Sequence, residues 1–414
     1  MTFDAIVVGA RCAGSPTAML LARRGHRVLL LDRAGFPSDA LSTHLIHVPG
    51  MAHLKRWGLH DAVVATGAPP HERFTMDFGA FVIDGPPPPV DGVSQPYCVR
   101  RTLLDTILVD AARDAGAEVR ERSPVDGLLR APDGRVTGVR AGGEELTARI
   151  VIGADGLHST VAREVGAGTY AATPALTAGY YAYYRGVSGP GAEIYQLGDS
   201  SSQATSHTAA AVGSPGGARA VVVFPTNDGL ACVFVACPIA QFHDFRLDVE
   251  GNYLAAIGRV PDLAARVAAG ERAERIRGTA DVPNFFRESA GPGWALVGDA
   301  GYHKDPCTAS GITDAFACAE LLAAAVDHGL TGGDLDEAVA GYVRARDERF
   351  GPALGLTCQL ASMEPPPPEM AALLAAVAAS PAETTRFFGM MQGSTPVPEY
   401  LSPANIGRIM SGSS

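Results

Sequence analysis

The sequence has no apolar run near the ~20 residues that cross a bilayer, so no membrane span is expected. It also has no basic excess. The 33 Lys and Arg residues stand against 44 Asp and Glu residues, a net charge of -11, which argues against a nucleic-acid partner. The first residues, Met1 to Asp4, show neither the basic start nor the apolar core of a signal peptide, which predicts a cytoplasmic protein.

The seven cysteines form no Cys-x-x-Cys pair, and none has histidines at the spacing of a metal site. An odd number of scattered cysteines is typical of reduced thiols in a cytosol rather than of a disulfide framework. We therefore expect no metal centre, and we expect the cysteines to serve mainly in packing.

The 414 residues are 47% hydrophobic and 19% charged, which predicts a folded chain of two or three domains. Buried-strand runs alternate with helices near the N-terminus and return at residues 295–299. Residues 176–237 instead have the pattern of an antiparallel sheet, which residues 73–84 would join, and the chain after Asp334 is mostly helical. The expected fold class is α/β: a Rossmann-like domain with an inserted antiparallel β-sheet domain and C-terminal helices.

The first motif lies between a short apolar strand and a helix. Residues 5–8 form the strand, and the turn follows as Gly9-x-Arg11-x-x-Gly14. Glycines at these positions permit a tight turn and close helix–strand packing, and the helix N-terminus offers N–H groups to a pyrophosphate. Asp32 closes the next strand and would accept a ribose hydroxyl, unless it only caps the turn. Arg11 takes the place of the usual second glycine, so its side chain must point away from the phosphates or surround them; an ordinary βα turn is the alternative.

Two further motifs each follow a buried strand. The first is Gly153-Ala154-Asp155-Gly156 and the second is Gly298-Asp299-Ala300-Gly301-Tyr302-His303-Lys304-Asp305-Pro306. An aspartate at the carboxyl end of such a strand faces the crevice in which open α/β sheets bind ligands. Glycine–aspartate pairs alone are common in turns, and it is the order of the three motifs that is informative.

In this order the motifs resemble those of the flavoprotein monooxygenases built like para-hydroxybenzoate hydroxylase, together with the related geranylgeranyl reductases. The resemblance covers about residues 1–330 and implies FAD as cofactor, with NAD(P)H or an external flavin reductase as electron source. It implies a discontinuous FAD-binding domain of residues 1–72, 97–175 and 275–330. Residues 73–96 and 176–274 would form the substrate domain, and residues 331–414 a C-terminal helical region.

The resemblance also implies cofactor contacts. Asp299 would accept a ribityl hydroxyl, and Arg101 would lie near the pyrophosphate, with Arg100 as the alternative. The N–H groups of Gly311 and Ile312 would face the flavin O2/N1 edge, where a helix dipole stabilises negative charge. The full set of expected cofactor-binding residues is Gly9, Arg11, Ala13, Gly14, Asp32, Arg33, Ser42, Thr43, Arg101, Val125, Asp155, Gly298, Asp299, Pro306, Gly311 and Ile312.

Candidate catalytic residues come from two places. Period 2 along the strand expected at 179–187 puts Tyr181, Tyr183 and Arg185 on one face, which would line a substrate pocket or simply pack in the sheet. His303 and Lys304 would lie near the flavin ring, where Lys304 would stabilise anionic flavin, orient an acidic substrate or pair with Asp305. His44 is a candidate base. Two further histidines, His47 and His207, are lesser candidates.

The resemblance implies a monooxygenase that hydroxylates or epoxidises a small aromatic or apolar metabolite through a flavin C4a-hydroperoxide, in secondary metabolism. Its partners would be the substrate and O2, in a monomer or homodimer. One alternative is a reductase of prenyl or other C=C bonds, as in the geranylgeranyl reductases. Another is a flavoprotein scaffold whose activity involves no redox turnover. Oxygen consumption separates the first two.

Overall fold

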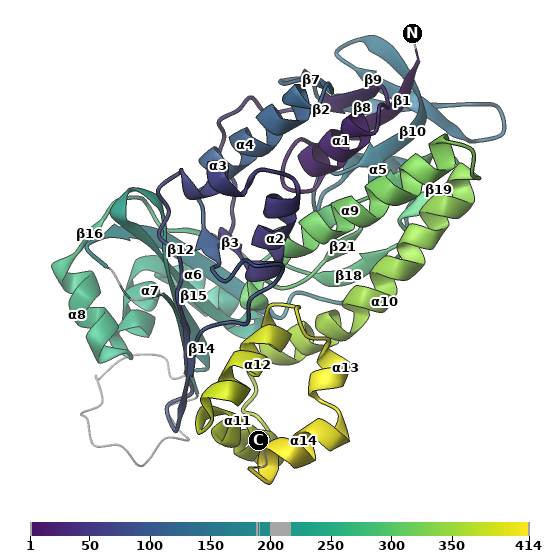
Figure 1. The fold of residues 1–414 in the computed structure, drawn as a ribbon. Coiled ribbons are helices and arrows are strands. Elements are labelled where there is room, and N and C mark those ends of the chain that lie inside the picture. The colour runs from purple at the N-terminus through teal and green to yellow at the C-terminus, as the bar shows by residue number, and fades with distance from the viewer. Residues whose placement is uncertain (1, 188, 190, 199–216, 413–414) are drawn as a thin grey trace.

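A computed structural model describes residues 2–187, 189, 191–198 and 217–412. One large sheet with its helices forms the upper part of Figure 1, a second sheet lies at the lower left, and the C-terminal helices lie at the lower right. The sequence-based fold class, α/β with an inserted sheet and C-terminal helices, is confirmed. None of the helices in the described part of the chain combines the length and apolarity that a membrane crossing needs.

The first sheet has strands from distant parts of the chain. Its order is β19-β20-β10-β1-β2-β7, and β1 pairs in parallel with both β10 and β2. Every residue of β2 is buried, as expected for a parallel strand covered on both faces. The strands are β19 (Ala290–Gly291), β20 (Trp294–Leu296), β10 (Glu144–Gly153), β1 (Phe3–Val8), β2 (Val28–Leu31) and β7 (Glu118–Arg120).

Helices and a hairpin complete this region. The helix α9 packs against both α1 and α10, so segments from the two ends of the chain lie side by side (Figure 1). The dipeptide Asp133-Gly134 between two β-rich runs predicts a hairpin, which is present as β8 and β9. The strand β9 also pairs with β10. These elements are α1 (Gly14–Arg23), α4 (Arg101–Asp114), α9 (Gly311–Leu330), α10 (Leu335–Ala361), β8 (Val125–Arg130) and β9 (Val136–Ala141).

The second sheet has the order β16-β12-β15-β14-β13-β4-β5, so the segment before the Pro86–Pro89 run does join it. One pairing differs from the antiparallel expectation, because β4 runs parallel to β13. The sequence pattern carries no information on strand direction for two strands this far apart. Within the segment 176–237 the sequence pattern also predicts a strand at 204–212, which lies outside the described residues. The strands are β16 (Glu271–Arg272), β12 (Thr177–Arg185), β15 (Leu230–Pro238), β14 (Arg219–Pro225), β13 (Ala192–Leu197), β4 (Phe74–Asp77) and β5 (Val82–Gly85).

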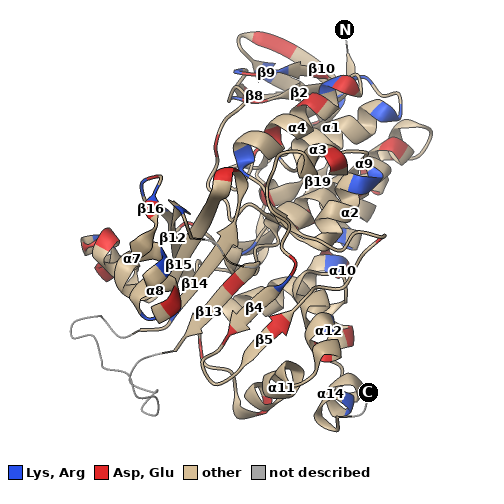
Figure 2. Ribbon diagram, turned by 60° about the vertical axis from the view of Figure 1, so that its left-hand side comes forward, with Lys and Arg blue, Asp and Glu red and all other residues tan. Residues whose placement is uncertain are grey.

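Both faces of the second sheet are covered. On one face Tyr180 and Tyr184 pack with Phe245, Tyr253 and Leu263. These three residues come from helices that the sequence did not predict: α6 (Phe242–Leu247), α7 (Val249–Gly258) and α8 (Pro261–Ala269). On the other face Tyr181 and Tyr183 share a cluster with residues of the C-terminal helices. The central strand β15 carries no charged side chain, and charged residues lie mainly at strand ends and on the outer helices (Figure 2).

The C-terminal part is helical, as the sequence predicts, and the proline run at 365–368 separates α10 from the next helix. After α10 the chain forms α11 (Pro368–Ala378), α12 (Pro381–Met391), α13 (Val397–Tyr400) and α14 (Pro403–Met410). The helices α11 and α12 pack against β5, and side chains of both helices join the apolar cluster under the second sheet. This part of the chain therefore closes one side of that sheet.

Candidate active site

A cleft of about 690 Å³ lies at the carboxyl ends of β1, β2 and β10, between the two sheets. Of the residues expected to bind the cofactor, all except Gly14 line it. His303, Lys304 and Tyr181 line it as well, whereas His44, Tyr183 and Arg185 do not. The three motifs, far apart in the sequence, therefore meet at one cleft, at the position where open α/β sheets bind ligands.

The glycines of the first motif are required by close packing. Gly9 has a φ of +103°, and a Cβ there would lie 2.3 Å from the carbonyl oxygen of Ala154. A Cβ on Gly14 would lie 1.7 Å from the carbonyl oxygen of Gly9. Any side chain would push the turn away from the strand β10 or from the helix α1. The backbone therefore makes a narrow turn beside the cleft, which fits the close approach of a pyrophosphate.

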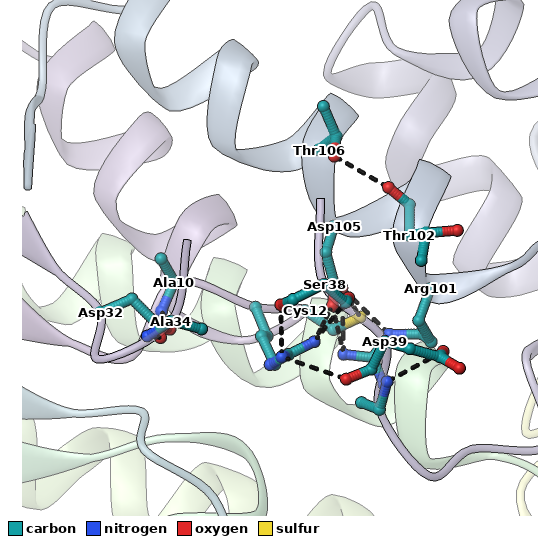
Figure 3. A network of polar contacts seen from close by, with 12 residues as sticks. Ala10, Cys12, Asp32, Ala34, Ser38, Asp39, Arg101, Thr102, Asp105 and Thr106 are labelled. Atoms are coloured by element: carbon teal, nitrogen blue, oxygen red, sulfur yellow. Dashed lines mark hydrogen bonds and ion pairs between the residues drawn. The ribbon is translucent and has the colours of Figure 1, made fainter. Parts of the chain in front are cut away.

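Arg11 points away from this turn. Its Nη1 donates to Asp105 Oδ2 at 2.6 Å, and its Nη2 donates to Ser38 Oγ at 2.8 Å. Asp105 is fully buried and also accepts from Arg101, through Nε at 3.0 Å and Nη2 at 3.1 Å (Figure 3). One carboxylate thus holds two arginines, so the cluster of Asp105, Arg11 and Arg101 is itself net positive, while the carboxylate of Asp32 also lies at the turn. A cation there suits a phosphate-bearing ligand.

The choice between Arg101 and Arg100 follows from their neighbours. Arg101 is buried and lines the cleft. Arg100 instead turns toward the second sheet, where its guanidinium lies 3.9 Å from the ring centroid of Tyr183 and its Nη2 donates to Glu274 at 2.8 Å. Arg101 is therefore the arginine placed to meet a ligand in the cleft.

Asp32, which follows β2, accepts hydrogen bonds from two backbone N–H groups. Its Oδ2 accepts from the N–H of Ala10 at 2.7 Å, and its Oδ1 accepts from the N–H of Ala34 at 2.7 Å (Figure 3). Each carboxylate oxygen has a second lone pair, so the side chain can bind a hydroxyl while it fixes the turn. This arrangement fits the ribose contact expected for a dinucleotide.

Two further aspartates differ in what they already bind. Asp155 accepts from the N–H of Thr160 at 2.6 Å and from Ser159 Oγ, at the start of the helix α5 (Thr160–Val165), whose N-cap is Ser159. Burial raises the pKa of Asp155. Asp299, in the turn Gly298–Ala300, is exposed in the cleft, and no described residue donates a hydrogen bond to its carboxylate. Asp299 is therefore the carboxylate available to accept a ligand hydroxyl.

Asp299→Ala is expected to weaken FAD binding by about 10- to 100-fold, because a hydrogen bond to a charged group is lost. Titration of the apoprotein with FAD, followed by flavin fluorescence, measures this. Asp281→Ala is the matched control. Asp281 also lines the cleft, but it is exposed and pairs with His158 at 3.0 Å. Equal FAD affinity of the Asp299 variant and the unaltered protein would refute the assignment.

The N-terminus of α9 also borders the cleft, through Gly311 and Ile312. Ser310, which precedes the helix, makes no side-chain hydrogen bond to its first turn. The first N–H groups of a helix lack partners within the helix, so these remain available to an acceptor. The helix dipole adds a partial positive charge, which suits an anionic ring edge.

Lys304 pairs with Asp314 rather than with Asp305. Its Nζ lies 2.8 Å from Asp314 Oδ2, and the two side chains are only 6% and 13% exposed. Asp305 is otherwise engaged, because it accepts from Thr177 Oγ1 at 2.6 Å and from the N–H of Cys307 at 3.0 Å. The sequence-based option of a Lys304–Asp305 pair is therefore wrong. The ion pair lies at the first turn of α9, on the wall of the cleft.

Lys304→Met is expected to lower the free energy of unfolding by about 3 kcal/mol, because it leaves Asp314 nearly buried without a cation. The double variant Lys304→Met/Asp314→Asn should recover most of this loss. Urea denaturation of the three proteins measures the effect. If the double variant is as unstable as the single one, the ion pair is not the cause.

The other candidate catalytic residues are dispersed. His303 donates from Nδ1 to the carbonyl of Pro283 and lines the cleft. His44 and Tyr183 form a buried pair, hydrogen-bonded through Nε2 and the phenol, with parallel rings 5.7 Å apart. Arg185 is exposed at the end of β12, where it donates to the carbonyl of Asp228, so it does not share the pocket face. The remaining candidate base, His207, lies outside the described residues.

A second, apolar pocket adjoins the cleft. It lies between the second sheet and α12, and its walls include Phe74, Phe224 and Phe388. It shares several lining residues with the cleft: Thr43, Phe234, Asp305, Pro306 and Ala309. The sequence indicates His47 as a lesser candidate base but does not identify these aromatic residues that line the pocket. Phe74, Phe224 and Phe388 come from β4, β14 and α12, which only tertiary packing brings together.

Residues 2–203 match the family model described as an FAD binding domain. Among curated proteins, Protein FixC of Salmonella typhi is 35% identical over 178 residues, 40% of this chain and 39% of that protein. The match thus spans well under half of that relative. Digeranylgeranylglycerophospholipid reductase 2 of Methanopyrus kandleri is 27% identical over 381 residues, 87% of this chain and 85% of the reductase.

A solved structure supports the fold along most of the chain. PqsL, described as a probable FAD-dependent monooxygenase from Pseudomonas aeruginosa, superposes with a TM-score of 0.70 at 19% identity. The superposition covers 94% of this chain and 99% of PqsL. At this identity the likeness establishes a shared fold.

Proposed function

Because residues 2–203 match the family model of an FAD binding domain, we propose that the chain is an FAD-dependent monooxygenase acting on a small aromatic or apolar metabolite. The observation that carries the proposal is the junction of the two cavities. The apolar pocket adjoins the dinucleotide cleft and shares the wall residues Pro306 and Ala309 with it, next to the N-terminus of α9. A substrate in this pocket would lie at the end of the cleft where the flavin ring is expected.

The residues of the cleft fit FAD, part by part. Asp32 would bind the adenosine ribose, the turn at Gly9 and the buried Arg101 would meet the pyrophosphate, and Asp299 would bind the ribityl chain. The free N–H groups at the start of α9 would meet the ring edge. When bound, FAD supplies the redox chemistry, with electrons from NAD(P)H or from a separate flavin reductase.

The pocket itself would orient the substrate and exclude water. Its aromatic walls and the closing helix α12 leave little polar surface around the position of the substrate. Exclusion of water protects reactive oxygen chemistry from wasteful side reactions. The side chains of the pocket would provide substrate orientation and water exclusion with either electron source.

Oxygen uptake tests the proposal. The FAD-loaded protein is supplied with NADH, NADPH or chemically reduced flavin, together with a panel of neutral aromatic and prenyl compounds. We expect oxygen consumption that matches product formation, and product that carries one atom from labelled O2. Product formed without oxygen would refute the monooxygenase. Activity that persists with FAD kept oxidised would support a scaffold without redox turnover.

One observation favours a second candidate, a reductase of prenyl or other C=C bonds. The similarity to the archaeal reductase covers 87% of this chain, and the pocket is as apolar as a prenyl chain requires. Such an enzyme would saturate its substrate under anaerobic conditions with reduced flavin. The same panel, assayed with and without oxygen, therefore decides between the two.

A further inference from the structure

The apolar pocket contains polar atoms that lack partners. Two belong to side chains that are almost fully buried: His47, at 5% exposure, and Gln392, at 3%. His47 Nδ1, Gln392 Oε1 and Thr308 Oγ1 have no hydrogen-bond partner in the described structure. A buried polar atom without a partner costs free energy, so three of them around one pocket indicate that a ligand satisfies them.

Their chemistry can be assigned from the bonds that the same side chains do make. His47 Nε2 lies 3.0 Å from the carbonyl oxygen of Thr308, which can only accept, so Nε2 carries the proton. Burial lowers the pKa of His47 to about 4, so the ring is neutral at neutral pH. Its Nδ1 is therefore a free acceptor.

The same reasoning applies to Gln392 at the end of α12. Its Nε2 donates to the carbonyl of Pro88 at 3.2 Å and to Ser394 Oγ at 3.1 Å. This orientation leaves Oε1 as a second free acceptor. The ring of Phe74 lies between the two sides of the pocket. Its centroid is 5.9 Å from the ring centroid of His47 and 5.5 Å from that of Phe388. Phe388 precedes Gln392 by one helical turn.

In the described part of the chain, the lack of cationic side chains around the pocket disfavours anionic ligands. No lysine or arginine lines it among the described residues. Its one carboxylate, Asp305, already accepts from Thr177 and from Cys307 N–H, and burial raises its pKa. A carboxylate or phosphate on the ligand would be buried there without a cation, at a large desolvation cost. Lys304 belongs to the cleft and is paired with Asp314.

We infer that the pocket selects a neutral, largely apolar molecule bearing a hydroxyl or N–H group, which donates its hydrogen bond to His47. The inference rests on the proposed function in placing the substrate in this pocket. The pocket has a volume of about 70 Å³. Since a benzene ring fills a cavity of ~150 Å³, the ligand extends into the cleft past the shared residues. Gln392 provides a second acceptor for a second donor group.

Binding to the oxidised, FAD-loaded protein tests this without turnover. Four single-ring probes share a toluene core and differ only in the para substituent: 4-methylphenol, 4-methylanisole, toluene and 4-methylbenzoate. Titrations followed by flavin absorbance, or by calorimetry, give their affinities. We expect 4-methylphenol to bind about tenfold more tightly than 4-methylanisole, and 4-methylbenzoate to bind more weakly than toluene. Equal affinities, a preference for the benzoate, or no binding of any probe would overturn the inference.

Two histidines give a matched pair of variants. His71 is also buried, contacts a carbonyl through Nε2 (Pro225, 2.9 Å) and has an unpartnered Nδ1, but it does not line the pocket. His47→Phe should remove the tenfold preference for 4-methylphenol, measured as the ratio of its affinity to that of 4-methylanisole, whereas His71→Phe should retain this preference. His47→Asn, which keeps an acceptor near the Nδ1 position, should restore part of it. The same loss in both Phe variants would contradict the assignment.

The outcome is independent of the proposed activity. If 4-methylphenol is not preferred but oxygen-coupled product still forms from other compounds, only the selectivity of His47 is wrong. If the preference holds but no oxygen is consumed with any reductant, the pocket is assigned correctly and the monooxygenase proposal fails.

Discussion

The free energy of unfolding is expected to fall by at least about 4 kcal/mol as the pH drops from about 8 to about 5. Burial lowers the pKa of His47 and of His71 from 6.5 to about 4, and that of His44 well below 6.5. In the unfolded chain each imidazole binds a proton near its ordinary pKa. Between about pH 6.5 and about pH 4 the unfolded state therefore binds more protons, and stability declines as the pH falls. Between about pH 8 and about pH 5, His47 and His71 each contribute about 2 kcal/mol to the loss in free energy of unfolding.

Urea denaturation at several pH values measures this dependence, and His71→Phe isolates one contribution. Phenylalanine cannot bind a proton, so the loss between about pH 8 and about pH 5 should shrink by about 2 kcal/mol. At the higher pH the variant should lose only about 1 kcal/mol, for the hydrogen bond to Pro225. An unchanged pH dependence would mean that His71 is not held neutral by burial.

The sequence predicts best those parts of the fold whose signal is local. The strands β1, β2 and β20 are short apolar runs bounded by glycine or aspartate, as buried parallel strands usually are. The turn at Gly9 and Gly14 is recognisable because no other residue fits its geometry. Aspartates that follow such strands lie at one sheet edge by topology alone, so the cleft could be expected from the chain order of the motifs.

What depends on tertiary packing could not be predicted. The partner of Lys304 is set by the way α9 begins, and sequence proximity pointed to Asp305 instead of Asp314. The strand β4 pairs with β13 in parallel, across more than a hundred residues of chain. The unpartnered acceptors of His47 and Gln392 share a pocket only because α12 packs over the second sheet.

Arg346 illustrates the same limit. In the sequence it is one arginine among several in α10, yet its side chain is fully buried. Its Nη1 donates to the carbonyl of Gly301 at 3.0 Å and to Ser289 Oγ at 2.5 Å. Its Nη2 donates to Tyr170 OH at 2.9 Å and to the carbonyl of Arg287 at 3.2 Å. One guanidinium thus joins α10 to the turn that carries Asp299.

Arg346→Met is accordingly expected to lower the free energy of unfolding by about 3–5 kcal/mol, because several buried acceptors lose their donor at once. Arg344→Met is the matched control on the same helix. Arg344 pairs with Glu337, and both side chains are largely exposed, at 67% and 73%, so its loss should cost less than about 1 kcal/mol. Chemical denaturation of both variants, with and without FAD, measures the difference. Since Gly301 follows Asp299 in the turn, FAD should also bind more weakly to the Arg346 variant and equally well to the Arg344 variant. If the two variants unfold at the same denaturant concentration, the buried guanidinium does not hold the turn in place.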